Sequence, residues 1–144
     1  MRIRELEGAI SAIRCYPNGP PETHKRTPFG IVSIDVHGNV YSFSPELMGY
    51  ATRAYPTFSL GNLTEKTFEE MLESSTLTRM QTEIDNGVEN CRRGCDYFQV
   101  CGGGSPANKI FENGSFASTE TMHCRLARQE ITKFVLKLID GRCA

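Results

Sequence analysis

Three cysteines and three consecutive glycines lie within one short segment of this chain, CRRGCDYFQVCGGGS at positions 91–105. A buried cysteine behaves as a small hydrophobic side chain, but this segment is polar and rich in glycine, so its cysteines are not core residues. Thiols this close together are either disulfide partners or ligands of a metal. A set of thiolate ligands usually has four members, so a fourth is expected elsewhere in the chain.

The composition is that of an ordinary folded protein of one domain. The 144 residues are 39% hydrophobic and 23% charged, with a net charge of −1, and a chain of this length buries a modest core. Such a balance of charge gives no reason to expect nucleic acid or an anionic membrane as a partner.

The compartment bears on the chemistry of the cysteines. The N-terminal sequence MRIRELEGAI carries charges where a signal peptide has an apolar run, and no segment approaches the roughly 18 apolar residues of a membrane span. We therefore expect a cytoplasmic location, where thiols stay reduced. The six cysteines are then more readily metal ligands than disulfide partners.

The first half of the chain predicts an α+β fold. Residues 4–14 have apolar side chains at helical spacing, and a proline-rich stretch follows them. Residues 30–44 are rich in Ile, Val, Tyr and Phe, and they predict a β-hairpin that turns near Gly38. Pro45, after Ser44, marks the start of a further helix.

A second helix is predicted after residue 63. Thr64 is a suitable N-cap, and Leu63 and Phe68 stand where a hydrophobic staple would place them. The Asn86-Gly87 pair predicts the end of this helix, just before the cysteine-rich segment.

The last predicted helix carries the fourth thiol. It begins at Ser118 or Thr119 and ends with Gly141 as its C′ residue. Cys124 lies in its first turn. Its expected apolar face consists of Met122, Leu126, Ile131, Phe134, Val135 and Leu138.

The candidate ligands are Cys91, Cys95, Cys101 and Cys124, in the spacing C-x3-C-x5-C-x22-C. Four thiolates complete either a tetrahedral zinc site or a cubane iron–sulfur cluster. Zinc sites favour two tight cysteine pairs, whereas here three ligands are expected on one irregular loop and one on a distant helix. This spread favours the larger cluster. The glycines at 102–104 favour it too, because they let the backbone approach inorganic sulfide and offer N–H donors.

Two other interpretations stay open from the residues alone. A zinc-stabilised binding module without a redox role would need the same ligands but not the three glycines. A small independent enzyme that uses His24, His37 or His123 has less support, because no spacing pairs these histidines with a nucleophile or with each other.

Three stretches together resemble a known family: GIVSIDVHGNVYSFSPELMG, then FSLGNL, then CRRGCDYFQVCGGGSPANKIFENGSFASTETMHCRLARQ. They are similar to the SPASM domain at the C-terminus of radical SAM peptide maturases, and the similarity is greatest to the Grr-type, cyclophane-forming group. It covers about residues 28–140. The resemblance implies an auxiliary 4Fe–4S domain that serves electron transfer and shapes the site for a ribosomally synthesised precursor peptide.

The resemblance also implies how many clusters to expect. A full SPASM domain holds two, and the second uses a C-x2-C-x5-C run and a later cysteine, positions that match Cys91, Cys95, Cys101 and Cys124. The first would need cysteines where this chain has Ser105 and Phe43. We therefore expect one auxiliary 4Fe–4S cluster, with Cys15 and Cys143 unassigned.

The radical SAM core itself is not expected in this chain, since no C-x3-C-x2-C motif is present. Residues 1–27 would be a terminal helix and linker resembling the end of a missing radical SAM barrel, and residues 28–144 the SPASM-like domain. No catalytic residue is expected, and S-adenosylmethionine would bind only through a core outside this chain. The expected partners are that core and the precursor peptide.

Overall fold

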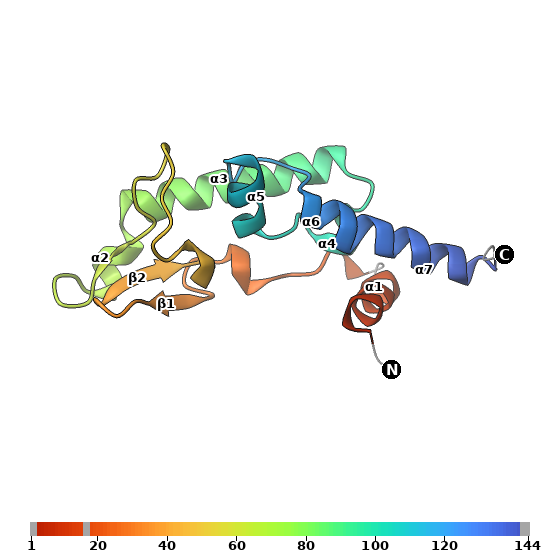
Figure 1. Ribbon diagram of the computed structural model, residues 1–144, viewed down its shortest axis with the longest axis horizontal. Coiled ribbons are helices and arrows are strands. Elements are labelled where there is room, and N and C mark those ends of the chain that lie inside the picture. The colour runs from red at the N-terminus through yellow and green to blue at the C-terminus, as the bar shows by residue number, and fades with distance from the viewer. Residues whose placement is uncertain (1–2, 16–17, 142–144) are drawn as a thin grey trace.

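The computed structural model describes residues 3–15 and 18–141. The molecule is elongated, with a small sheet at one end and the helices α1 (Arg4–Arg14) and α7 (Ile131–Ile139) at the other (Figure 1). The long helix α3 (Ser75–Gly94) runs along the molecule from the sheet toward the shorter helices between the two ends. The α+β class and the helix over residues 4–14 are confirmed.

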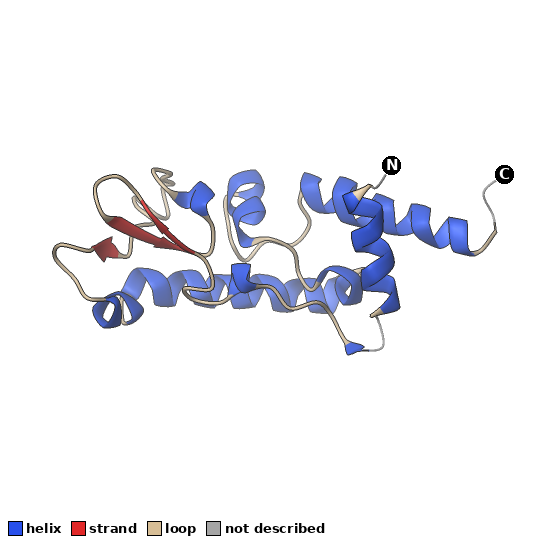
Figure 2. Cartoon of the chain, turned by 90° about the horizontal axis from the view of Figure 1, so that it is seen from below, coloured by secondary structure: helices blue, strands red, loops and turns tan. Residues whose placement is uncertain are grey.

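The sheet has three antiparallel strands in the order β1 (Val32–Ile34), β2 (Asn39–Ser42) and β3 (Gly61–Asn62) (Figure 2). The predicted hairpin is confirmed, and Gly38 adopts the positive φ of +84° that its turn requires. The carboxylate of Asp35 stabilises this turn by accepting hydrogen bonds from the backbone N–H groups of residues 37 and 39.

The predicted start of the second helix is wrong. Two helices are present, α2 (Phe68–Leu72) and α3, and each has its own cap. Thr67 forms a capping box with Glu70, and the hydroxyl of Ser74 accepts a hydrogen bond from the N–H of Leu77. Thr64 instead donates both its N–H and its hydroxyl to the side chain of Asn62. Local turn chemistry after β3 therefore delays the helix.

The predicted end of that helix at Gly87 is also wrong, since α3 continues to Gly94. Gly87 is buried and lies beside the backbone of Phe116, and a Cβ atom there would stand 2.2 Å from the Phe116 carbonyl oxygen. The glycine is thus explained by close packing within the helix rather than by helix termination.

The C-terminal helix begins slightly later than predicted. Thr121, rather than Ser118 or Thr119, caps α6 (Met122–Cys124) by accepting a hydrogen bond from the N–H of Cys124. Gly141 has a φ of +65° at the far end, as predicted. The remaining segments are η2 (His24–Arg26), η3 (Pro45–Leu47), α4 (Phe98–Cys101), α5 (Pro106–Asn113) and the π-helical stretch η4 (Arg125–Glu130), which joins α6 to α7.

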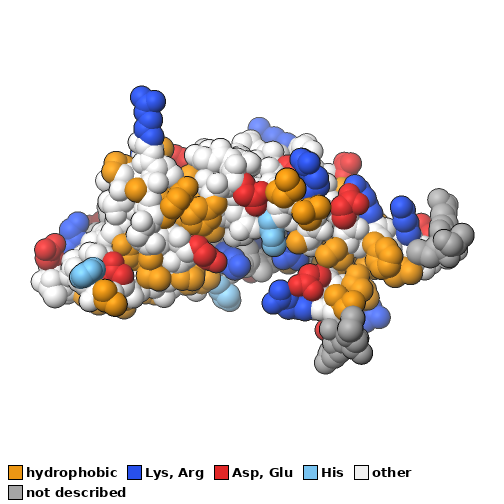
Figure 3. Space-filling view, in the orientation of Figure 1, with side chains coloured by type: hydrophobic (Ala, Val, Ile, Leu, Met, Phe, Trp, Pro, Cys, Tyr) orange, Lys and Arg blue, Asp and Glu red, His pale blue; other side chains and the backbone are white. Residues whose placement is uncertain are grey.

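The predicted apolar face of the last helix is largely exposed. Only Val135 of that face is buried. Helix α1 packs against α7, and apolar side chains show on the surface at this end of the molecule (Figure 3). The exposed ones are Ile3, Ile10, Met122, Leu126, Phe134, Leu136, Leu138 and Ile139. No helix in residues 3–15 or 18–141 is long and apolar enough to cross a membrane.

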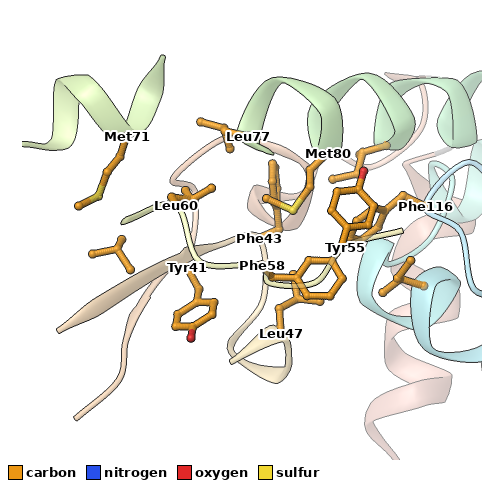
Figure 4. Close-up of a cluster of buried hydrophobic side chains, with 13 residues drawn as sticks. Tyr41, Phe43, Leu47, Tyr55, Phe58, Leu60, Met71, Leu77, Met80 and Phe116 are labelled. Atoms are coloured by element: carbon orange, nitrogen blue, oxygen red, sulfur yellow. The ribbon is translucent and has the colours of Figure 1, made fainter. Parts of the chain in front are cut away.

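The hydrophobic core lies between the sheet, the loops after it and α3, where Met80 extends toward the aromatic side chains (Figure 4). Tyr55, Phe58 and Phe116 form its aromatic centre, with stacked and edge-to-face rings. Phe43 is fully buried there although its φ is +69°, a left-handed conformation that bulky residues rarely adopt. The core thus holds the sheet to the N-terminal part of α3 and leaves the end of α3 for the cysteine site.

Candidate metal centre

The structure brings the four predicted ligands to one place. Cys91 lies in the last turn of α3, Cys95 directly follows that helix, Cys101 ends α4 and Cys124 ends α6. All four line a single cavity of about 1040 Å³. The expectation of three ligands on one irregular loop is wrong, because helices α3 and α4 carry Cys91 and Cys101.

Backbone hydrogen bonds between nearby residues position the first three cysteines around the cavity. The N–H of Cys95 donates to the carbonyl of Cys91 (3.0 Å), and the N–H of Phe98 donates to the carbonyl of Cys95 (3.0 Å). The buried Phe98 ring anchors this turn, and the guanidinium of Arg92 lies 4.9 Å from its centre. The chain therefore reverses direction tightly between α3 and α4.

The three glycines shape the wall beside Cys101. Residues 102–104 all have positive φ, at +67°, +100° and +74°. The N–H of Gly103 donates to the Sγ of Cys101 (3.4 Å). A Cβ atom on Gly102 would stand 2.6 Å from the Pro21 carbonyl oxygen, so glycine is needed where the preceding loop crosses the site.

Burial raises the pKa values of two of the thiols. For Cys95 and Cys124 the main cause is loss of solvent, and the neighbouring cysteines raise both pKa values further. Raised pKa values mean that a metal must displace protons from these thiols when it binds. Thiols that affect one another in this way belong to one site.

The donor set suits a thiolate-bound group. Four thiols line the same cavity, and glycine backbone forms part of its wall. Four cysteine thiolates are the usual ligand set of an iron–sulfur cluster and also of a structural zinc ion. Among residues 3–15 and 18–141, no group of three or more His, Cys, Asp or Glu side chains is already arranged around a metal ion.

The other residues considered from the sequence have different surroundings. Cys15 is exposed at the end of α1 but also lines the cavity, and Cys143 lies outside the described residues. Ser105 lines the cavity as well, whereas Phe43 lies in the hydrophobic core. Of the three histidines, only His123 borders the cavity. No disulfide joins the five cysteines that the structure describes.

Sequence reasoning missed two side chains that contact the thiols. The ammonium group of Lys109 lies 3.4 Å from the Sγ of Cys91, and the amide of Gln129 lies 3.7 Å from the Sγ of Cys124. The sequence does not single out Lys109, because lysine side chains are usually exposed. Lys109 is a charged residue on the face of α5 that also buries Pro106 and Ile110.

Comparison with known proteins points to the same chemistry. Residues 26–96 match the family model of SPASM, an iron-sulfur cluster-binding domain. The matched range contains Cys91 and Cys95 and ends before Cys101 and Cys124. This match supports an iron–sulfur cluster-binding SPASM domain in the chain.

The chain is similar to part of a longer protein. The chain is 39% identical over 139 residues to an uncharacterized protein of Synechocystis sp., an alignment that covers 96% of this chain and 35% of that protein. The chain therefore spans about a third of the length of this relative. No solved structure matches the chain.

Proposed function

We propose that this chain is an auxiliary iron–sulfur domain that holds one 4Fe–4S cluster through Cys91, Cys95, Cys101 and Cys124. The observation that carries the proposal is that the three thiols of the cysteine-rich segment and the distant Cys124 line one cavity. The SPASM match supports the type of cofactor. The placement of Phe43 in the hydrophobic core supports one cluster rather than two.

The residues of this chain would bind the cluster, shield it and donate hydrogen bonds to its ligands. When bound, a cluster with four cysteine ligands supplies electron transfer and leaves no iron open to substrate. Arg26 holds the preceding loop over the site, because its guanidinium donates to the carbonyls of both Pro21 and Gly102. No residue of the chain is proposed as catalytic.

In the wider proposal, this domain is part of a radical SAM enzyme that modifies ribosomally synthesised precursor peptides. Within that enzyme the domain would serve electron transfer and shape the peptide site. Two observations support it: the resemblance of residues 28–140 to Grr-type maturases, and the greater length of the Synechocystis relative. In this proposal residues 1–27 are the terminal helix and linker, and residues 28–144 are the cluster domain. The partners would be the radical SAM core and the precursor peptide.

Anaerobic reconstitution of the full chain tests the cofactor. We expect about four irons and four acid-labile sulfides per chain, with a brown colour. Cys101→Ala should abolish iron binding, and Cys15→Ala, which changes a thiol that also lines the cavity, should leave the iron content unchanged. Full iron binding by Cys101→Ala would refute the assigned ligand set.

The same preparation distinguishes the proposed function from the alternative. A zinc-stabilised binding module would give about one zinc per chain, no sulfide and no colour. That result would remove the redox role and reduce the similarity to the maturases to one of fold.

A further inference from the structure

Lys109 is the one charged side chain that is buried among residues 3–15 and 18–141, with 3% of its surface exposed. Burying an ammonium group is costly unless an opposite charge or strong hydrogen bonds compensate it. None of the ion pairs in this part of the chain includes Lys109. Its compensation must therefore come from the two groups that it contacts.

Those two groups lie one helical turn apart on α3. The Nζ of Lys109 donates to the carbonyl of Gly87 (2.8 Å) and to the Sγ of Cys91 (3.4 Å). The carbonyl is neutral, whereas a cysteine that binds a metal does so as a thiolate and then carries a negative charge. The Sγ of Cys91 is therefore the contact through which the ammonium group would act on a bound cluster.

The surrounding structure keeps the ammonium group in this place. Ser105 precedes α5 and Pro106 opens it, and the helix buries Lys109 on the same face as Ala107 and Ile110. A Cβ atom on Gly87 would approach the Nζ of Lys109 to 3.1 Å, so the glycine makes room for it. The contact is thus fixed from both helices.

The other ligands receive weaker donors. Cys101 accepts from the backbone N–H of Gly103, and Cys124 accepts from the neutral amide of Gln129. The guanidinium of Arg26 also interacts electrostatically with Cys101, but its hydrogen bonds go to backbone carbonyls. Among the described residues, Cys91 is the ligand that has a cation in direct contact with its sulfur.

We propose that Lys109 is a positioning residue that donates a hydrogen bond to the Sγ of Cys91 and raises the reduction potential of the cluster bound there. This inference rests on the proposed function. A cluster gains negative charge when it is reduced, so a fixed cation and a hydrogen bond at a ligand sulfur favour the reduced state. The added electron is stabilised on the Cys91 side of the site.

The test is a redox titration of the reconstituted full chain, with dithionite as the one-electron donor and electron paramagnetic resonance as the readout. Lys109→Met keeps the length of the side chain and removes the charge. We expect its ratio of reduced to oxidised cluster at a fixed solution potential to fall about tenfold or more, which for one electron is about 59 mV. Lys109→Arg should stay closer to the wild-type potential than Lys109→Met.

A matched control separates a local effect from one of net charge. Lys137→Met removes the same charge from an exposed position on α7 and should leave the potential unchanged. Equal potentials for wild type and Lys109→Met would overturn the inference while leaving the proposed function intact. A wild-type chain without iron and sulfide would refute both.

A second measurement covers a Lys109→Met variant that takes up no cluster. Wild-type chain labelled with ¹⁵N only in its lysine side chains is reduced and studied by pulsed electron paramagnetic resonance. Coupling of the cluster to a lysine ¹⁵N should be seen, and it should persist in Lys25→Met, which removes the other lysine that borders the cavity. Absence of this coupling in the wild type, or its loss in Lys25→Met, would overturn the inference.

Discussion

Gly87 offers the sharpest test of how the site is packed. It lies inside α3, and a Cβ atom there would stand 2.2 Å from the carbonyl oxygen of Phe116 and 3.1 Å from the Nζ of Lys109. The first neighbour is backbone and cannot rotate away. Gly87→Ala therefore forces α3 away from the segment that follows α5.

The magnitude follows from three opposing effects. Alanine gains about 1 kcal/mol over glycine in a helix interior. Overpacking costs about 1–3 kcal/mol, and weakening the hydrogen bond from the Lys109 ammonium to the Gly87 carbonyl costs a further ~1.5–3 kcal/mol. The net loss in the free energy of unfolding should be about 1.5–5 kcal/mol.

Anaerobic thermal unfolding of the reconstituted chain measures this loss, at one scan rate for all variants. A loss of that size lowers the midpoint by about 3–20 °C for a domain of this length. Gly8→Ala is the control, because Gly8 lies in α1 with nothing within 4 Å of an added Cβ atom, and it should not lower the midpoint.

Gly87→Asn distinguishes packing from helix termination. Asparagine is tolerated at a C′ position, so it would be milder than alanine if Gly87 ended the helix. In the packed position the larger side chain should be worse than alanine. A Gly87→Ala midpoint at or above that of the wild type, or a milder effect of asparagine, would refute the reasoning.

Three further predictions concern the loop over the site, α6 and the hairpin. Arg26→Met removes the hydrogen bonds that hold the preceding loop to the triple glycine, so the amides of residues 102–104 should exchange with deuterium faster and the free energy of unfolding should fall by about 1–2 kcal/mol; unchanged exchange would contradict this. Glu112→Gln weakens the contact of its carboxylate with the first N–H groups of α6, so the loaded chain should lose about 0.5–2 kcal/mol and release iron to a chelator faster, and a wild-type release rate would count against it. Hydrogen bonds, first from the Asn39 side chain, hold the pKa of Asp35 below its ordinary value of 3.8, so Asp35 contributes stability that is present above that value and is lost as the pH falls through the lowered pKa. Titration of the Asp35 carboxyl by nuclear magnetic resonance should show a midpoint below 3.8 that rises in Asn39→Ala.

The sequence predicts those elements whose structure depends on the spacing of nearby residues and on turn residues. The helix over residues 4–14 and the hairpin at Gly38 follow from spacing and turn residues, and both are confirmed. Thr64 and Gly87 were misread because their roles depend on neighbours. Thr64 bonds to Asn62 in the turn after β3, and Gly87 packs on a segment that follows α5.

The residues of the candidate site also fall into two groups, those that the sequence identifies and those that only the structure reveals. Its four cysteines could be selected from the sequence because residue type and spacing identify thiolate ligands, and the structure places them around one cavity. That they bind a cluster stays a prediction. Lys109 could not be selected, because a lysine in a short amphipathic helix is usually exposed, and only the packing of α5 on α3 reveals its contact with Cys91.

Helix α5 contains no proposed ligand, yet it joins the two halves of the site. Lys109 reaches the last turns of α3, and Glu112, one turn later, contacts the start of α6, which carries Cys124. The side chain of Asn113 donates to the carbonyl of Glu120, just before α6. Hydrogen bonds that involve side chains of one helix therefore hold Cys91 and Cys124 relative to each other. A search for ligand residues overlooks such a helix. Substitutions on α5 should nevertheless disturb the positions of Cys91 and Cys124 as much as the loss of a hydrogen bond to one of these cysteines.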